Sequence, residues 1–345
     1  MTLPKDMRAL VLNNDGFSLE KTGSVLEALD PYVNLRRVDV PKPGPTQVLL
    51  KVALAAINPS DVMFLKGLYG QPRVKGCPAG FEGVGTVVAT GDDPLAAGLA
   101  GKRVAFTTGA SGWGSWAEYA VAESAACIPL VDGVRDEDGA ALIVNPLTAL
   151  AMFDIVREAG ERAFIMSAGG SQLSKFILQI AGEEGFRPIV TVRREEQVEA
   201  LKQLGAVHVL NAAASDFQEK LQDVMKAEKP CIFLDAVTGS LASAIFTAMP
   251  AGARWIIYGR LDLGETVIPE PGQLIFMHKH IEGFWLRQWM REAGGRRLKA
   301  VAEAQTRFAD GRWSTDVTAV VPLSDALARV AEELAKPDGK VFIKP

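Results

Sequence analysis

Two adjacent arginines, Arg193 and Arg194, are the residues of this chain whose position most clearly suggests a chemistry. They follow an apolar run, residues 188–190, which comes about 20 residues after a glycine-bearing turn at residues 167–171. An acidic side chain at this place would bind the ribose hydroxyls of NAD, whereas a cation can pair with the 2′-phosphate of NADP. The pair therefore predicts NADPH binding, with Arg193 as the first candidate because it ends the predicted strand. The alternative is that both arginines are solvated and pair with the two glutamates that follow.

The turn before the arginines carries two glycines, Gly169 and Gly170, which could let the backbone approach a pyrophosphate. Amide groups at the start of the next helix could donate hydrogen bonds to the same group, and the helix dipole would favour its charge; these amides belong to Ser171, Gln172 and Leu173. A complete G-x-G-x-x-G pattern is absent, because serine or leucine stands where the later glycines would be. An ordinary turn between a strand and a helix would also explain the glycine pair alone.

Strands and helices are expected to alternate around this turn. Apolar runs predict strands at residues 163–166, 189–192, 207–210, 231–235 and 255–258. Helical spacing of apolar residues predicts helices at residues 171–183 and 195–204, and a further helix capped by Ser215. This alternation predicts a doubly wound parallel sheet of Rossmann type, which binds its ligand at the carboxyl ends of the strands.

The domain organisation follows from where this alternation begins and ends. Residues 1–137 contain short β-like runs broken by glycine and proline, which predict an antiparallel, barrel-like domain. Residues 138–286 form the predicted nucleotide-binding domain. Residues 287–345 contain a basic helix and a final strand at 340–344, and we expect them to return to the first domain because they cannot bury a core alone.

The composition excludes several classes of protein. The chain has 345 residues, of which 48% are hydrophobic and 23% charged, and its formal net charge is -4. We therefore expect no nucleic-acid partner, and no membrane partner because no run approaches the ~20 apolar residues of a membrane span. The N-terminus lacks a secretory pattern, and three scattered cysteines, Cys77, Cys127 and Cys231, argue against a disulfide framework or a zinc lobe. A cytoplasmic protein is predicted.

Motifs along nearly the whole chain resemble a known family. They are Ile-Asn-Pro-Ser-Asp at 57–61, Lys-Gly-Leu-Tyr-Gly at 66–70, Ala-Gly-Phe-Glu-Gly-Val-Gly at 79–85, Asn-Pro-Leu-Thr-Ala at 145–149, Tyr-Gly at 258–259 and Gly-Phe-Trp-Leu at 283–286. With these motifs the chain resembles the zinc-independent branch of the medium-chain dehydrogenase/reductases, which includes NADPH:quinone oxidoreductases and 2-enoyl thioester reductases. The resemblance implies an α/β fold in which a GroES-like β-barrel catalytic domain accompanies the Rossmann domain. It also implies a homodimer formed through an edge strand near residues 255–258.

One departure from the zinc enzymes of this family bears on the chemistry. Those enzymes have Gly-His-Glu where this chain has Gly-Phe-Glu at residues 80–82, and Phe81 offers no sulfur, nitrogen or oxygen to a metal. His278 and His280 lack a third ligand nearby in the sequence, so no metal site is predicted. Without a Lewis acid, we expect reduction of a quinone or a polarised C=C bond rather than alcohol oxidation, because hydrogen bonds can support the charge that hydride addition creates.

The resemblance also provides two candidate catalytic residues. Tyr69 matches the tyrosine proposed as proton donor or orienter in enoyl thioester reductases, and a phenol can donate a proton to an enolate. Asn58 is expected to line the nicotinamide cleft between the two domains. Each residue has a structural alternative: Tyr69 as an ordinary turn residue, and Asn58 with Asp61 as a turn and helix cap.

The remaining candidate cofactor contacts come from the resemblance as well. They are Thr148 at the start of a helix, the pair Tyr258 and Gly259, and the segment Phe284, Trp285 and Leu286 through its backbone. A basic cluster follows this segment and could hold the phosphates of a CoA thioester, although such runs are more often solvated helix faces. The cluster comprises Arg287, Arg291, Arg296, Arg297 and Lys299.

Together these observations predict an NADPH-dependent, zinc-independent oxidoreductase of the quinone reductase type. Its small-molecule electron acceptor would be a quinone or an α,β-unsaturated carbonyl, reduced by hydride transfer. A 2-enoyl thioester reductase is the close alternative. An alternative of another class is a non-catalytic NADPH-binding sensor, which the incomplete glycine pattern leaves open.

Overall fold

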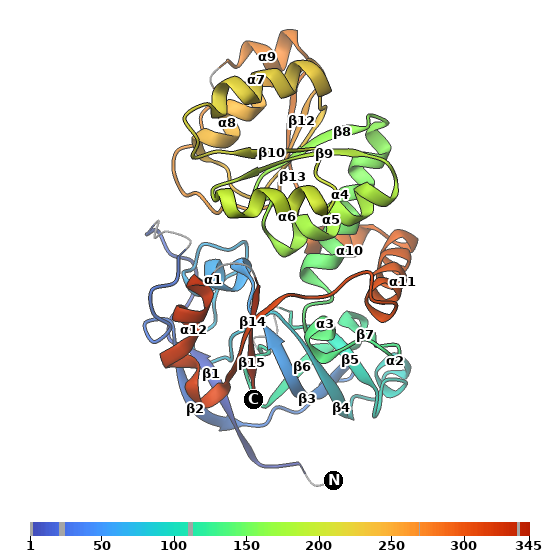
Figure 1. Ribbon diagram of the computed structural model, residues 1–345. Helices are drawn as coiled ribbons and strands as arrows, with labels where there is room; N and C mark the ends of the chain where they lie inside the picture. The colour runs from blue at the N-terminus through green and yellow to red at the C-terminus, as the bar shows by residue number, and fades with distance from the viewer. Residues whose placement is uncertain (1–2, 21–24, 110–112, 269, 337–338) are drawn as a thin grey trace. The chain divides into compact units, whose positions relative to one another are not determined.

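The chain forms two compact units in a computed structural model that describes residues 3–20, 25–109, 113–268, 270–336 and 339–345 (Figure 1). The first unit contains residues 1–146 and 301–345, and the second contains residues 147–300. The C-terminal segment thus belongs to the same unit as the N-terminal segment. The boundaries proposed from the sequence, after residues 137 and 286, both lie upstream of these divisions.

Antiparallel strands dominate the first unit. A seven-stranded sheet has the order β14, β15, β3, β4, β5, β7, with β6 also paired to β3. These strands are β3 (Gln47–Ala56), β4 (Glu82–Thr90), β5 (Arg103–Thr107), β6 (Tyr119–Glu123), β7 (Cys127–Pro129), β14 (Val317–Pro322) and β15 (Lys340–Lys344). A separate antiparallel pair consists of β1 (Asp6–Leu12) and β2 (Val33–Asp39).

Alternating side chains of these strands build the core of the first unit. Val48, Leu50 and Val52 of β3 point into one buried cluster, as expected for a strand whose side chains alternate between faces. The helices of this unit are α1 (Pro59–Leu65), α2 (Pro94–Ala97), α3 (Asp136–Ala140) and α12 (Ala326–Ala335), with 3-10 turns at Ser124–Ala126 and Leu323–Asp325. The core therefore combines strands from the N-terminal segment with α12 and β15 from the C-terminal one.

A parallel sheet of six strands forms the centre of the second unit. Its order is β10, β9, β8, β11, β12, β13, and every neighbouring pair is parallel. The strands are β8 (Ala163–Met166), β9 (Arg187–Val192), β10 (His208–Asn211), β11 (Ile232–Asp235), β12 (Arg254–Ile257) and β13 (His280–Gly283). The strand order reverses between β8 and β11, so a ligand crevice is expected outside their carboxyl ends.

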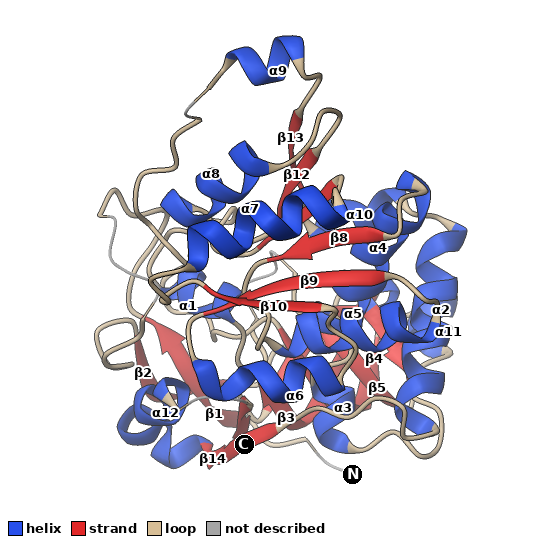
Figure 2. Ribbon diagram, turned by 45° about the horizontal axis from the view of Figure 1, so that its top comes forward, coloured by secondary structure: helices blue, strands red, loops and turns tan. Residues whose placement is uncertain are grey.

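Helices cover both faces of the parallel sheet. Figure 2 shows α7 and α8 on one face and α5 and α6 on the other. The helices of this unit are α4 (Val144–Ala159), α5 (Gln172–Glu183), α6 (Val198–Gln203), α7 (Phe217–Glu228), α8 (Gly239–Ala248), α9 (Gly272–Phe276) and α10 (Leu286–Glu292), with a 3-10 turn at Glu195–Gln197. A further helix, α11 (Gly295–Ala309), crosses the division between the units, as does the first turn of α4. This is a doubly wound sheet.

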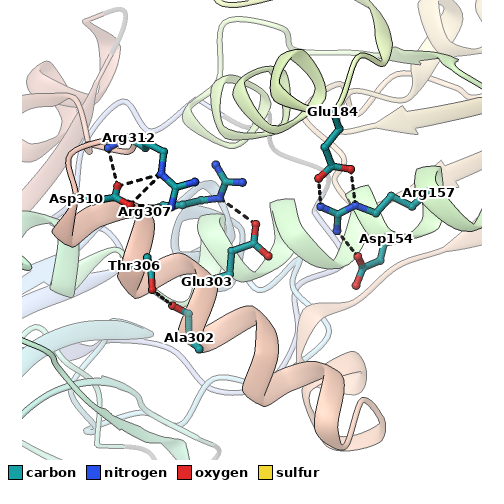
Figure 3. Close-up of polar contacts among 9 residues, drawn as sticks. All are labelled: Asp154, Arg157, Glu184, Ala302, Glu303, Thr306, Arg307, Asp310 and Arg312. Carbon is teal, nitrogen blue, oxygen red and sulfur yellow. Dashed lines mark hydrogen bonds and ion pairs between the residues drawn. The ribbon is translucent and has the colours of Figure 1, made fainter.

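Ion pairs reinforce individual helices within each unit (Figure 3). In the second unit, Arg157 of α4 pairs with Asp154 on the same helix and with Glu184 at the end of α5. In the first unit, Arg307 of α11 pairs with Glu303 one turn earlier. Pairs spaced three or four residues apart lie on one helix face, so these contacts stabilise the helices they belong to.

The predicted fold class, a Rossmann-type sheet with a GroES-like domain, is confirmed, but three details were wrong. The C-terminal segment contains β14 and α12 in addition to the expected basic helix and final strand. The residue that caps α7 is Asp216 rather than Ser215. The strand near residues 255–258 is β12, which pairs on both sides; the edges of the described sheet are β10 and β13. Nowhere in the described ranges does a helix have the length and apolarity needed to cross a membrane.

Candidate active site

The start of α1 is fixed by a buried carboxylate. Asn58 precedes the helix, and Pro59 occupies its first position, where its fixed backbone angle suits a helix. A side-chain oxygen of Asp61 accepts the Asn58 backbone N–H at 2.8 Å, and the other accepts the Phe81 N–H at 2.9 Å. Asp61 therefore joins the helix start to the segment that leads into β4. Asn58 and Asp61 thus form the turn and helix cap that the sequence offered as their structural role.

The Asn58 amide is held on both sides by charged groups. Its nitrogen donates to Glu82 Oε1 at 2.8 Å, and its oxygen accepts a hydrogen bond from the Lys340 ammonium of β15. Glu82 Oε2 accepts the Val144 N–H at 2.9 Å. Asn58, Asp61, Glu82 and Lys340 are all buried, so their hydrogen bonds replace the water that they lack. The orientation of Asn58 follows from this cluster, and its contact with a substrate or cofactor stays a prediction.

Burial dominates the acid–base properties of this cluster. The pKa of Asp61 is raised to about 7, chiefly by desolvation and also by the charge of Glu82, while the Asn58 and Phe81 backbone hydrogen bonds and Lys340 oppose the rise. Desolvation also raises the pKa of Glu82, against the pull of Lys340, and lowers the pKa of Lys340. Asp61 is thus a buried group that changes charge near neutral pH.

Asp61 is expected to make the folded protein less stable as the pH rises towards neutrality. Because its pKa is raised from 3.8 to about 7, the folded state retains a proton that the unfolded chain has released across this range. The contribution of this proton to the free energy of unfolding is complete below the unfolded pKa. It is lost as the pH rises through the folded pKa, at up to about 1.4 kcal/mol per pH unit. The variant Asp61→Asn should flatten this decline when unfolding by denaturant is measured between about pH 4 and 7. The exposed Asp136→Asn provides a control with the wild-type slope; an unchanged slope in Asp61→Asn would contradict the assignment.

Tyr69 lies on the segment that follows α1, where its half-buried ring rests on a small aromatic stack. Its ring centroid is 5.1 Å from that of Phe81, which in turn lies 4.9 Å from that of Phe64. Phe81, the residue that stands in place of a zinc ligand, therefore serves as the support of the Tyr69 ring. The stack limits the orientations open to the phenol. The role of Tyr69 as a proton donor stays a prediction.

The glycine-bearing turn between β8 and α5 packs closely against the end of β9. The Gly169 N–H donates to the Thr191 carbonyl at 2.9 Å, and a Cβ added at Gly169 would lie 2.8 Å from Cβ of Val190. A Cβ added at Gly170 would lie 2.3 Å from the Gln197 amide nitrogen. Gly169 is thus required by the neighbouring Val190, in addition to any approach of a phosphate, whereas the Gln197 amide beside Gly170 is the end of a flexible side chain that can move.

The start of α5 is capped by its own residues. The Ser171 hydroxyl accepts the Ser174 N–H at 3.2 Å, and the Ser174 hydroxyl donates to the Ala168 carbonyl at 3.1 Å. A helix start supplies amide donors and a positive dipole end, as the prediction for Gln172 and Leu173 requires. The Leu173 side chain is buried, so a cofactor contact of this residue would use its backbone.

Tyr258 and Gly259 lie beside this turn, immediately after β12. The Tyr258 N–H donates to the Asp235 carbonyl at 2.9 Å. Burial raises the pKa of the Tyr258 phenol and the charge of Asp235 adds to the rise, whereas a hydrogen bond with Ser174 opposes it. The structure thus brings Tyr258 together with the capped start of α5.

Asp235, which the sequence reasoning did not select, joins β11 to its two neighbouring strands, β8 and β12. Its carboxylate accepts the Ser167 hydroxyl at 2.6 Å and the Trp255 indole N–H at 2.9 Å. It also accepts the Val237 N–H at 2.9 Å and the Thr238 N–H at 3.1 Å. Burial raises its pKa, and these hydrogen bonds oppose the rise. The only sequence signal was an acidic residue at the end of an apolar strand.

Arg193 follows the last residue of β9 and is exposed, whereas Arg194 is half-buried. Within the described part of the chain, Arg193 forms no ion pair with the glutamates that follow, and Glu195 instead accepts a hydrogen bond from the Asn211 amide at 2.9 Å. Arg194 has other interactions. The guanidinium of Arg193 is therefore the more accessible one for an anion at the strand tip.

The other predicted cofactor contacts lie on three further segments. Thr148 is buried on α4. Phe284 continues from β13, with its N–H donating to the Ile257 carbonyl at 2.8 Å, and this bond places it next to the end of β12. Trp285 and Leu286 begin α10, and the Arg287 guanidinium lies 5.8 Å from the Trp285 ring centroid. These roles remain predictions.

The second unit fits a dinucleotide that carries a 2′-phosphate. The capped start of α5, the glycine turn and the exposed Arg193 all lie at the carboxyl edge of one parallel sheet. Helix-start amides suit a pyrophosphate, and a guanidinium suits a phosphate monoester. Across the described residues, no group of three or more potential ligands among histidine, cysteine, aspartate and glutamate could hold a metal.

Comparisons with known proteins identify the family. The model for the alcohol dehydrogenase GroES-like domain matches residues 44–132, and the model for zinc-binding dehydrogenases matches residues 173–301. The chain belongs to the medium-chain dehydrogenase/reductase family, as the motifs predicted. Its members are oxidoreductases, so the predicted class of enzyme is confirmed as well.

Individual relatives cover all or nearly all of the chain. A crystal structure of a candidate NADPH:quinone reductase from Mesorhizobium loti is 69% identical, covers 100% of both chains and gives a TM-score of 0.98. The mitochondrial enoyl-[acyl-carrier-protein] reductase of Bos taurus is 28% identical over 94% of this chain and 84% of its own. The Etr1p/Etr2p 2-enoyl thioester reductase heterodimer of Candida tropicalis, at 20% identity and a TM-score of 0.79, covers 99% of this chain and 100% of its own and shares the fold.

Proposed function

We propose that this protein is an NADPH-dependent oxidoreductase that reduces a quinone or an α,β-unsaturated carbonyl by hydride transfer. The observation that carries the proposal is the exposed Arg193 guanidinium at the carboxyl end of β9, beside the glycine turn and the capped start of α5. The full-length similarity to a candidate NADPH:quinone reductase supports it.

We propose the following roles for the residues of the chain. NADPH, when bound, would supply the hydride. Arg193 would pair with the 2′-phosphate, and the amides at the start of α5 would hold the pyrophosphate. Tyr69 would hold a proton on its phenol oxygen and donate it to the acceptor as negative charge develops there. Phe81 supports this ring where a zinc enzyme would place a ligand, so we propose a zinc-independent reaction.

The test of this proposal is a panel of electron acceptors. NADPH oxidation is followed with quinones, with small enones and with trans-2-enoyl-CoA, each in the presence and absence of a metal chelator. The proposal expects turnover with quinones or enones and equal rates with and without the chelator. The absence of turnover with all three classes would overturn the enzyme proposal.

A 2-enoyl thioester reductase is the second candidate function. The similarity to mitochondrial enoyl-[acyl-carrier-protein] reductases favours it. The basic cluster of α10 and α11 could contact thioester phosphates, although Arg296 pairs with Glu158 at 3.5 Å. A preference for trans-2-enoyl-CoA over quinones and small enones would establish this candidate. Tight NADPH binding without turnover would instead favour a non-catalytic sensor.

We also propose a homodimer that forms along β13. This strand lies at the edge of the described sheet and therefore offers unused backbone groups to a second copy. Close to it in sequence on α9, Ile275 is 73% exposed and Phe276 is 86% exposed. Two adjacent apolar side chains with this exposure are typical of a surface that contacts another protein.

The variant Phe276→Asp is expected to shift the protein from dimer to monomer. A carboxylate at this place would have to be buried without a partner in the dimer, and that cost is several kcal/mol. Light scattering coupled to size-exclusion chromatography measures the mass. Leu95→Asp, at an exposed apolar position of α2, is the control that should remain dimeric. A monomeric wild type, or a dimeric Phe276→Asp, would refute the interface.

We assign the protein to the cytoplasm. Its three cysteines, Cys77, Cys127 and Cys231, are free thiols, which suits a reducing compartment.

A further inference from the structure

Arg73 is a buried arginine whose side chain bonds three backbone carbonyl groups. Its Nε donates to the Gly16 carbonyl at 3.0 Å, its Nη2 to the Asp15 carbonyl at 3.2 Å and its Nη1 to the Leu65 carbonyl at 3.0 Å. The residue is only 8% exposed. Among the residues that the structure describes, it forms no ion pair with a carboxylate, so its charge is balanced by carbonyl dipoles alone.

These bonds close the segment that carries Tyr69. Leu65 ends α1 and Arg73 follows eight residues later, so the bond from Arg73 Nη1 to the Leu65 carbonyl joins the two ends of the segment. Residues 66–70, the motif that contains Tyr69, lie inside the closed loop. The position of the Tyr69 phenol therefore depends on how firmly this loop is held.

A strip of the N-terminal segment holds the same loop from the side. Gly16 and Arg73 exchange backbone hydrogen bonds of 2.9 and 3.1 Å, and the Ser18 N–H donates to the Gly67 carbonyl at 2.9 Å. Gly67 has a φ of +72°, and a Cβ added there would lie 2.6 Å from Arg73 Nη2. The guanidinium thus lies directly against the backbone of the loop, in a space that only glycine leaves open.

The chemistry of Arg73 suits orientation better than simple packing. An apolar side chain could fill the same volume without bringing a charge into the interior, which is costly. A planar guanidinium instead directs several donors along fixed lines, and bonds from an ionised donor are stronger than neutral ones. A lysine would keep the charge but has a single nitrogen and cannot reach three carbonyl groups in this fixed geometry.

We propose that Arg73 is a positioning residue for Tyr69. It holds the loop of residues 66–72 so that the phenol, supported by Phe81, lies where the acceptor receives its proton. This inference rests on the proposed role of Tyr69 as proton donor or orienter. Arg73 acts on turnover through Tyr69 and makes no contribution to NADPH affinity.

The test is a double-mutant cycle between Arg73→Lys and Tyr69→Phe. Arg73→Lys alone should lower kcat by roughly 10- to 100-fold, since a displacement of about 1 Å at a reacting group has effects of this size. The Kd for NADPH should stay at the wild-type value. In the Tyr69→Phe background, Arg73→Lys should lower kcat no further, because the group that it positions has been removed. Arg103→Lys on β5, which loses contacts to Asp136 and to the Val134 carbonyl, is the control and should leave kcat unchanged.

The outcomes separate this inference from the proposed function. If Tyr69→Phe lowers kcat and Arg73→Lys does not, the inference fails and the role of Tyr69 stands. Equal losses from Arg73→Lys in both backgrounds would also overturn it, because they would indicate a general structural effect. If Tyr69→Phe leaves kcat unchanged, the role of Tyr69 fails and the inference fails with it. Should Arg73→Lys not fold, Arg73→Gln, which keeps two N–H donors without the charge, takes its place in the same cycle.

Discussion

The variant Arg193→Ala is expected to weaken NADPH binding by roughly 10- to 100-fold and to leave NADH binding nearly unchanged, because one charge-assisted contact contributes about 1.5–3 kcal/mol. The two dinucleotides differ by the 2′-phosphate, and the exposed guanidinium at the end of β9 is the group that we assign to it. Titration of the wild type and the variant with both dinucleotides gives the four Kd values that test whether Arg193 binds the 2′-phosphate.

The chain offers matched controls for this measurement. Arg187 begins the same strand at its opposite end and pairs with Glu228, so Arg187→Ala should leave both Kd values unchanged. Arg194→Ala should have a smaller effect than Arg193→Ala, since Arg194 is half-buried. A loss of affinity in Arg193→Ala that is equal for NADPH and NADH would show that the residue does not read the 2′-phosphate.

The variant Tyr69→Phe is expected to lower kcat by about 100-fold while the Kd for NADPH stays the same. Removing the hydroxyl takes away the proton and keeps the ring, so the stack on Phe81 remains and the loop keeps its shape. Steady-state kinetics with the best acceptor of the panel, together with a separate titration of NADPH, distinguishes a loss in the chemical step from a loss in binding.

Tyr119→Phe is the matched control for this variant. Tyr119 is a half-buried tyrosine on β6, away from the loop of residues 66–72 in the sequence, and its replacement should leave kcat at the wild-type value. A wild-type kcat in Tyr69→Phe would remove Tyr69 from the mechanism and leave proton delivery to water or to another group.

The parts of the fold that could be predicted are those with a strong local pattern. Apolar runs separated by helical spacing predicted β8, β9, β11 and α5 to within a few residues, because each of these elements buries one face or both. Two elements of the C-terminal segment were missed. The strand β14 and the helix α12 were not among the expected elements, although residues 317–321 form a short apolar run; β14 fully buries only Val321, so it lacks the buried alternation of a core strand.

The parts of the site that could not be predicted depend on pairing across long stretches of chain. The Asn58 amide bonds Lys340, which lies 282 residues later, and Asp235 bonds Ser167, which lies 68 residues earlier. No spacing rule connects such residues. A lysine that begins a buried strand and an aspartate that ends one were the available signals, and a search for charges inside apolar runs would have found both.

The glycine turn shows how a correct position can have an incomplete explanation. Gly169 and Gly170 were selected for the approach of a pyrophosphate. The structure shows that Val190 already excludes a side chain at Gly169, whereas the Gln197 amide beside Gly170 can move. A substitution at Gly169 would disturb the contact of the turn with β9 before any cofactor is present, so loss of NADPH affinity in a Gly169 variant would not by itself identify a phosphate contact.

The discontinuous first unit has a consequence for synthesis on the ribosome. β15 is the last strand to emerge, yet it pairs with β3 near the start of the chain and brings Lys340 to Asn58. Until then Ala55 and Ala56 at the end of β3 lack their partner strand on one side, and the buried amide lacks its cation. The second unit, which is continuous in sequence, can complete its own sheet earlier. The emergence of β15 therefore sets the moment at which the nascent polypeptide first acquires a complete interior around Asn58.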